Sequence, residues 1–360
     1  MYALVIGLAA FLAANPMAAQ RAMPESSPTT APKVGTVIIP ALDGALVATL
    51  VVRPSTKDLA PYVDRARLDV FTLDSMVAST DSAADVVRIN YAAGRTSAQV
   101  SPMILSLLAA ADRAWILSDQ RLDPTSPPLV DALKIREQLG LVQSAAQFDS
   151  LRALVDLGAV KVDTAARTVM LPRLGMRLDL SLIARGRGFD LARAAFPVSA
   201  FAGGVIQVGP SAVAFGRPAH GNRWQIVLAP PHTGRTGIGV ATIDSGAVYV
   251  VADSAHGQFD DRHPVRLVNA QTGDAPSGVG SVTVISPTAE RANADAAALY
   301  MLTPERALSV ADSAGIAAMI IRRPPDGKPI GPADVLLSAR ARRLIELVPA
   351  LTSSAAGRAR

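Results

Sequence analysis

The sequence contains no cysteine, few aromatic residues and no long run of charge of one sign. Without cysteine, disulfides, thiol nucleophiles and zinc–thiolate sites are excluded. Aromatic residues make up 4% and hydrophobic residues 50% of the 360 residues, enough for one large or two moderate cores. The net charge is +5, but Lys and Arg are scattered singly or in short runs such as Arg342-Arg343. No aromatic residues are interleaved with them, so a solvated basic surface is favoured over a nucleic-acid-binding one.

The N-terminus carries an apolar run, residues 3–14, which is too short to span a bilayer. Small residues follow at Ala18 and Ala19, and residues 23–33 are rich in Pro, Ser and Thr. A signal peptide cleaved near Gln20 fits this order, whereas a buried N-terminal helix fits poorly beside such a linker. We therefore expect an exported, periplasmic or extracytoplasmic protein without a membrane span in the mature chain. The expected organisation is a signal peptide (1–20), a linker (21–43), one domain (44–338) and a basic tail (339–360).

Hydrophobic periodicity predicts a mixture of helices and short strands in the remaining sequence. Residues 45–52 are rich in β-branched residues, as in a strand, and residues 59–77 have helical spacing. Ser101 is a predicted N-cap for a helix over 103–117. The three prolines within 122–130 predict an ordered loop or turn.

Strands become closely spaced after residue 200, and helices follow near the end of the chain. The expected strands are 160–162, 168–171, 177–180, 205–208, 224–228, 237–243, 247–251, 282–285 and 317–321. The expected helices are 146–157, one opened by Gly186 and Gly188, 289–301, 304–313 and a short amphipathic one in the tail. This order predicts an α+β fold.

Several short motifs occur in a distinctive order along the chain. They are residues 75–90, Asp123-Pro124-Thr125 with residues 128–130, residues 176–190, Ala202-Gly203-Gly204, Gln271-Thr272-Gly273, and residues 281–285 with 298–302. Each alone is weak, but six in this order are hard to explain by chance. Over roughly residues 44–322 the chain resembles the FAD:protein FMN transferases, the ApbE-like flavin transferases, as a divergent member.

The resemblance implies an ApbE-like α+β fold with antiparallel sheets and flanking helices. It also implies an activity, the transfer of FMN from FAD to a Thr or Ser hydroxyl of an acceptor protein, with Mg²⁺ as the expected metal. FAD and a flavinylated acceptor protein would be the partners. A non-catalytic flavin- or nucleotide-binding protein, or an envelope protein that keeps only the scaffold, are the alternatives.

The cofactor-binding residues implied by the resemblance come from four of the motifs and from one further position. They are Asp123, Thr125, Arg185, Gly203, Gly204, Asp253, Thr272 and Gly273. Glycine-rich backbone lets N–H groups approach phosphates closely, which suits the pyrophosphate of FAD. The alternative for the glycines is that they serve turns and close packing.

The implied metal ligands are a backbone carbonyl, assigned to Ala184, and two side chains on a late helix. Counting back from Ala298, the family's Asp position is Asn293 and its Thr position is Ala297. Asn offers only a neutral oxygen and Ala offers none, so the metal site is expected to be degraded. Asp295 lies about 200° from Asn293 around the helix and is expected at the surface.

The implied catalytic positions are also substituted. The family's His falls at Arg266 and its Asp at Asn269, and Arg cannot take over proton transfer because it stays charged. Two arginines, Arg187 and Arg266, stand where the family has other residues. They either counter the pyrophosphate in place of a metal or are solvated side chains of a disused site.

Overall fold

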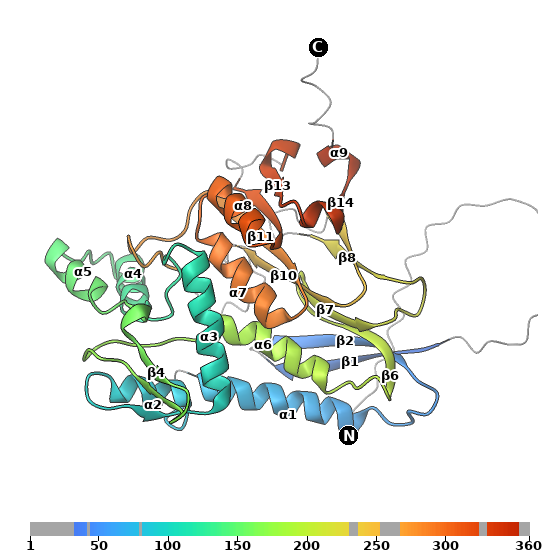
Figure 1. Cartoon of the computed structure of the whole chain (residues 1–360), viewed down its shortest axis with the longest axis horizontal. Coiled ribbons are helices and arrows are strands. Elements are labelled where there is room, and N and C mark those ends of the chain that lie inside the picture. The colour runs from blue at the N-terminus through green and yellow to red at the C-terminus, as the bar shows by residue number, and fades with distance from the viewer. Residues whose placement is uncertain are drawn as a thin grey trace, which may run out of the picture. The chain divides into compact units, whose positions relative to one another are not determined.

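The central feature of the fold is an eight-stranded antiparallel sheet (Figure 1). A computed structural model describes residues 32–41, 44–78, 81–229, 237–252, 267–323 and 330–352. The strand order is β1-β2-β6-β7-β10-β11-β12-β13. The bounds are β1 Lys33–Ala41, β2 Gly44–Val52, β6 Phe201–Val208, β7 Ser211–Gly216, β10 Gly246–Ala252, β11 Val279–Ser286, β12 Ala317–Arg322 and β13 Val335–Leu337.

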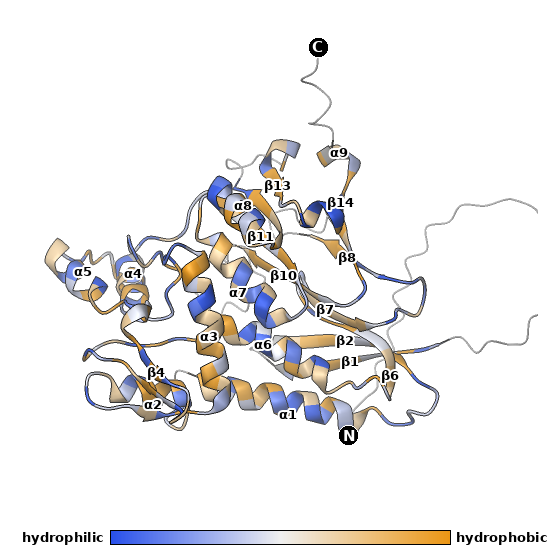
Figure 2. Cartoon of the chain, viewed as in Figure 1, coloured by the Kyte–Doolittle hydropathy of each residue, from blue (hydrophilic) through white to orange (hydrophobic). Residues whose placement is uncertain are grey.

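Helices cover one face of this sheet (Figure 1). They are α1 Ala60–Val77, α3 Pro102–Leu117, α6 Ser181–Ala194, α7 Ala289–Tyr300 and α8 Pro304–Ser313. Strand residues alternate between the two faces, so Ala247 and Tyr249 of β10 pack among the helices while Val248 does not. In Figure 2 apolar residues follow the strands, and α6 and α7 carry both polar and apolar segments.

The other face carries a second, smaller core and a three-stranded sheet of order β14-β9-β8. Its strands are β8 Trp224–Leu228, β9 Gly239–Ile243 and β14 Ile345–Leu347. Val248 and Met319 of the large sheet pack there with Leu228, Ala241 and Ile345. The large sheet is thus buried between helices and a small sheet over part of its width.

The remaining elements before α6 in the sequence lie beside α3 (Figure 1). They are α2 Asp85–Ala92, β3 Ala98–Gln99, α4 Pro127–Leu139, α5 Ala145–Arg152, the 3-10 helix η1 Leu157–Ala159, β4 Lys161–Asp163 and β5 Thr168–Met170. Two 3-10 helices, η4 Pro332–Asp334 and η5 Ala341–Arg343, and the short α9 Pro349–Thr352 complete the described chain. The third sheet has the order β3-β5-β4.

The α+β expectation is confirmed, and so is the cap at Ser101, whose hydroxyl accepts a hydrogen bond from the Ile104 N–H at 3.4 Å. Three local predictions were wrong. Residues 177–180 form no strand, α6 begins at Ser181 before its glycines, and α4 begins inside the proline-rich segment. Pro127 and Pro128 lie in the first turn of α4, where a missing N–H costs nothing. Strand β7 was not predicted.

Both predicted ends of the domain also differ from the structure. The expected linker contains β1, which pairs with β2 from Lys33↔Val52 to Ala41↔Gly44. The expected tail contains β14, which pairs with β9. The expected signal peptide lies outside the described residues, and within these no helix is long and apolar enough to cross a membrane.

Candidate functional site

The closest approach of α6 to α7 lies at the predicted metal position. A Cβ added to Gly186 would lie 2.5 Å from the carbonyl oxygen of Ala289 and 2.7 Å from the Cβ of Asn293. Glycine therefore lets the two helices touch backbone to backbone. This contact brings the Asn293 side chain, which has no exposed surface, against the first turn of α6.

Asn293 meets α6 through its amide nitrogen. Its Nδ2 donates to the carbonyl oxygen of Leu182 at 2.5 Å and to that of Ile183 at 3.3 Å. Its Oδ1 is buried and has no hydrogen-bond partner. The carbonyls engaged are thus those of Leu182 and Ile183, immediately before the predicted Ala184, which is itself buried.

These donors and acceptors do not fit a magnesium ion as the side chain stands. Mg²⁺ requires several oxygen ligands close to octahedral geometry, and here an N–H donor faces the carbonyl oxygens. Ala297, the second ligand position, is fully buried and carries no oxygen. Among the residues that the structure describes, no group of three or more His, Cys, Asp or Glu could hold a metal ion.

Asp295 is not the surface carboxylate that the sequence suggested, because α3 covers its side of α7. Its side chain is 3% exposed and bonds two arginines. Arg113 of α3 donates from Nε to Oδ1 at 2.8 Å, and Arg291 donates from Nε to Oδ2 at 2.9 Å. Asp295 therefore fastens α3 to α7 and is not available as a ligand.

The N-terminus of α7 is capped by Asp190 of α6. The carboxylate accepts from the N–H groups of Ala289 and Glu290, both at 2.9 Å. Burial raises the pKa of Asp190, and these two hydrogen bonds partly oppose the rise. Asp190 ends the quoted motif of residues 176–190, but nothing in the pattern alone indicated that it would cap another helix.

Beside this cap, Arg187 and Glu290 form a loose ion pair. Their Nε and Oε2 atoms lie 3.8 Å apart, and both atoms are buried without a hydrogen-bond partner. Burial raises the pKa of the Glu290 carboxyl, while the charge of Arg187 lowers it. Arg187, expected as a possible substitute for metal charge, is thus balanced by a carboxylate of α7.

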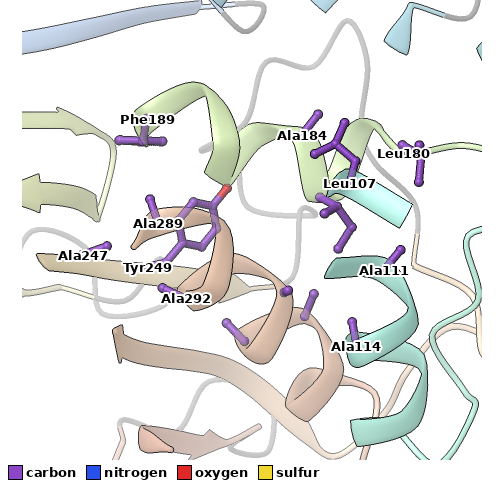
Figure 3. Close-up of a cluster of buried hydrophobic side chains, with 14 of the residues drawn as sticks. Leu107, Ala111, Ala114, Leu180, Ala184, Phe189, Ala247, Tyr249, Ala289 and Ala292 are labelled. Carbon is purple, nitrogen blue, oxygen red and sulfur yellow. The ribbon is translucent and has the colours of Figure 1, made fainter. Parts of the chain in front are cut away.

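Arg185 lies close enough to Tyr249 of β10 to act on it electrostatically. Burial raises the pKa of Tyr249 to about 12, and the positive charge of Arg185 partly opposes the rise. Figure 3 shows the Tyr249 hydroxyl pointing toward α6, with Phe189 and Ala184 on either side of it. Arg185 thus brings a cationic side chain to the same part of α6 that contacts Asn293.

The Asp-Pro-Thr turn is buried and internally bonded. Asp123 Oδ1 accepts from the hydroxyl of Thr125 at 2.6 Å, and its Oδ2 accepts from the Leu157 N–H at 2.9 Å. The Thr125 hydroxyl oxygen also accepts from the Asp156 N–H at 2.8 Å. Burial raises the pKa of Asp123, and its hydrogen bonds oppose the rise. Both side chains therefore brace the segment before η1.

The predicted glycine pair lies inside β6, between β2 and β7. A Cβ on Gly203 would lie 2.2 Å from the carbonyl oxygen of Arg217, and one on Gly204 would lie 2.8 Å from a methyl group of Leu50. Close packing thus accounts for both glycines. This is the alternative to phosphate binding that the sequence left open. Their cofactor-binding role stays a prediction.

Residues 269–273 form a tight turn. Asn269 Oδ1 accepts from the Gln271 N–H at 2.9 Å, and its carbonyl accepts from the Gly273 N–H at 2.7 Å. Gly273 has φ +75° and packs on Phe148 of α5. Thr272 is exposed. Asn269 thus shapes this turn with its amide oxygen, a role that the sequence did not suggest.

Backbone hydrogen bonds link these separate pieces. The Ala270 N–H donates to the Arg121 carbonyl at 2.9 Å, and the Asp179 N–H donates to the Pro124 carbonyl at 2.8 Å. The 269–273 turn, the Asp-Pro-Thr turn and the start of α6 are therefore connected in series. Gly203 and Gly204 are not part of this series.

Two residues singled out in the sequence, Asp253 and Arg266, lie outside the described residues. Two surface hollows occur elsewhere, with volumes of about 330 and 340 Å³. Ser55, Lys57 and Tyr62 are among the residues that line the first, and neither hollow is lined by a predicted site residue.

Comparison with known proteins points to one family. A model of the ApbE family matches residues 47–320. The FAD:protein FMN transferase of Salmonella typhimurium is 23% identical over 308 residues, which are 83% of this chain and 87% of that protein. The FAD:protein FMN transferase of Treponema pallidum is 27% identical over 292 residues, which are 72% of this chain and 77% of that protein.

Solved structures show the same fold. The flavin transferase ApbE from Vibrio cholerae superposes with a TM-score of 0.74 at 18% identity, over 87% of this chain and 99% of that one. The apo form of flavinyl transferase ApbE from Pseudomonas stutzeri superposes with a TM-score of 0.74 at 22% identity, over 87% of this chain and 97% of that one. The expected fold is therefore confirmed, and because the family model spans most of the sequence, this chain belongs to the ApbE family.

Proposed function

We propose that this chain is an FAD:protein FMN transferase. The observation that carries the proposal is the match of the ApbE family model to residues 47–320, which includes both turns and the α6–α7 contact. The relatives reported above bear this activity in their names and align over most of their own length. The substrates would be FAD and a protein with an accessible Thr or Ser hydroxyl.

FAD would supply the reacting group. Its pyrophosphate P–O bond breaks, AMP leaves with the bond's electron pair, and a new bond joins the FMN phosphorus to the acceptor oxygen, whose proton is released. Arg185 is suited to face the pyrophosphate, because a guanidinium offers charge and several N–H donors. Thr272 is exposed beside the φ +75° turn and is suited to a contact with the nucleotide. Asp123 and Thr125 hold the neighbouring segment in place and need no direct contact.

A second candidate is a flavin-binding protein that transfers nothing. The bonding of Asn293 to two carbonyls of α6 favours it, because a magnesium ion cannot be held there as the side chain stands. If the chain is instead the transferase of the first proposal, its transfer of FMN is slow or does not depend on magnesium.

One experiment separates the two candidates. The purified chain is incubated with FAD and a Thr-containing acceptor protein, and intact-mass spectrometry looks for an added FMN. Transfer abolished by Arg185→Gln supports the enzyme. Bound FAD detected by its visible spectrum, without transfer to any acceptor offered, supports the binding protein. If the chain neither transfers FMN nor binds FAD, both candidates are contradicted.

We further propose that the chain is exported, on the apolar run of residues 3–14 and the small residues before Gln20. N-terminal sequencing of the protein from its native cell envelope tests this. A protein recovered from the cytoplasm with Met1 intact would contradict it.

A further inference from the structure

Asn293 occupies the point where α6 and α7 touch, and its environment is unusual for an amide. It has no exposed surface, and four alanines surround it in α7, at positions 292, 294, 296 and 297. Both of its amide hydrogens point to carbonyl oxygens at the start of α6. Its Oδ1 accepts no hydrogen bond.

The chemistry of the contact fixes which way the amide faces. If the amide were reversed, Oδ1 would lie 2.5 Å from the carbonyl oxygen of Leu182 and 3.3 Å from that of Ile183. Three oxygen atoms at these distances repel one another unless a proton or a cation lies between them. The observed orientation leaves one buried oxygen unbonded, which costs less than that repulsion.

We infer that the Asn293 amide takes the place of a divalent cation as the bridge between α6 and α7. In this chain an N–H donor satisfies the carbonyls of Leu182 and Ile183, where an ion would otherwise have to do so. The helix contact is then complete without metal. The inference concerns the helix contact itself and holds whether or not the chain transfers FMN.

The surroundings leave no room for a divalent cation beside the Asn293 amide. Ala297, one turn after Asn293, supplies no oxygen, and Gly186 brings α6 close enough to exclude even an added methyl group. Asp295 is bound to Arg113 and Arg291, and Asp190 is bound to the N-terminus of α7. Asp295 and Asp190 are thus already committed to other groups, and Glu290 faces Arg187 at 3.8 Å.

The test uses the full chain and measures the melting temperature in EDTA and in increasing MgCl₂, with NaCl at matched ionic strength as the salt control. The wild-type melting temperature should be the same in EDTA and in MgCl₂. Asn293→Asp places carboxylate oxygens against the two carbonyls and should melt several degrees lower in EDTA. Magnesium should restore most of this loss, because the new oxygens then have a cation between them.

Asn222→Asp is the matched control, since the same chemical change falls on an exposed residue and should give no response to magnesium. Asn293→Ala removes the bridge without adding charge, so it should melt lower than wild type at every magnesium concentration. If Asn293→Asp yields no folded protein, the melting temperatures of wild type and Asn293→Ala in EDTA and in MgCl₂ still test the inference.

Three results would overturn the inference. The first is a wild-type melting temperature that rises with MgCl₂ but not with NaCl. The second is an Asn293→Asp variant that equals wild type in EDTA, or one that stays equally low with and without magnesium. The third is an Asn293→Ala variant as stable as wild type.

Discussion

Two acidic residues of α7 show how local bonding decides what a buried charge does. Asp295 is almost fully buried, yet two arginines hydrogen-bond its two oxygens. Glu290 is more exposed, but its Oε2 lacks a hydrogen bond and its arginine is 3.8 Å away. Burial therefore raises the pKa of Glu290, and Arg187 only partly compensates. Ionised Glu290 is a small cost to the fold.

Glu290→Gln removes this cost and should change the pH dependence of stability. Because the folded pKa of Glu290 lies above its unfolded value, its contribution is complete below the unfolded pKa and is lost as pH rises through the folded pKa. The variant lacks this loss. Its free energy of unfolding minus that of wild type should therefore increase between about pH 4 and pH 8, measured by urea titration.

Glu305→Gln is the control with the opposite sign. Glu305 is exposed, and its hydrogen bond to Arg322 lowers its pKa, so wild type gains stability as pH rises above the folded pKa. Because that gain is complete once the pH exceeds the unfolded pKa of about 4.5, the difference between this variant and wild type should decrease only below about pH 5 and stay flat from there to pH 8. A difference for Glu290→Gln that is flat, or that falls with pH, would contradict the account of its burial.

At the scale of elements, α7 is the helix that holds the site together, and it is buried over most of its length. Residues 292–300 are all buried, including Asn293 and Asp295. The prediction that Asp295 lies at the surface was wrong. From residue 292 onward α7 is enclosed by α3, α6 and the sheet, and a local sequence pattern does not reveal this enclosure.

The family resemblance, counted back from Ala298, placed Asn293 on the late helix at the metal position, and the structure buries its side chain there. The partners of Asn293 could not be predicted, because they depend on how closely α6 approaches. The sequence placed the start of α6 at its glycines, reading them as a helix opening. They lie within the helix, and Gly186 marks the contact between two helices.

Gly186→Ala tests that contact. Alanine in a helix interior is favoured over glycine by about 1 kcal/mol, so propensity alone predicts a more stable protein. The added Cβ would lie 2.5 Å from the carbonyl oxygen of Ala289, however, and that oxygen belongs to the backbone of the packed helix α7. Such overpacking costs about 1–3 kcal/mol, and a clash with packed backbone belongs at the upper end of that range. After the propensity gain of about 1 kcal/mol, we expect the free energy of unfolding to fall by about 2 kcal/mol.

Gly158→Ala is the matched control, because a Cβ there meets neighbours at 3.4 Å or more, an ordinary contact distance. Its free energy of unfolding should stay within about 0.5 kcal/mol of wild type. Equal stability of Gly186→Ala and wild type in denaturant titrations would show that α6 and α7 can separate without cost.

At the scale of the molecule, the strand and helix order and the α+β class followed from periodicity, but the ends of the domain did not. Residues 33–41 follow a Pro/Ser/Thr-rich stretch and were read as linker. Residues 339–352 carry many arginines and were read as tail. Each segment contains a strand that is held by another strand, β1 by β2 and β14 by β9. Composition does not reveal such pairing, so it misplaced both segments.

Two shortened chains test where the domain ends. Residues 32–352 keep every described strand and should melt as the full chain does. Residues 44–338, the span that composition suggests, lack β1 and β14 and leave Leu46 and Ala241 without their covering strands. Ile39 and Ile345 are 0% and 7% exposed, and burying each such side chain is worth about 1.5–3 kcal/mol. We therefore expect residues 44–338 to melt far lower than 32–352, or to aggregate through the unpaired edge of β2. Circular dichroism melts and size-exclusion chromatography measure both effects. Equal melting temperatures for the two chains would mean that β1 and β14 add nothing to the fold, and the composition-based boundaries would then be the correct ones.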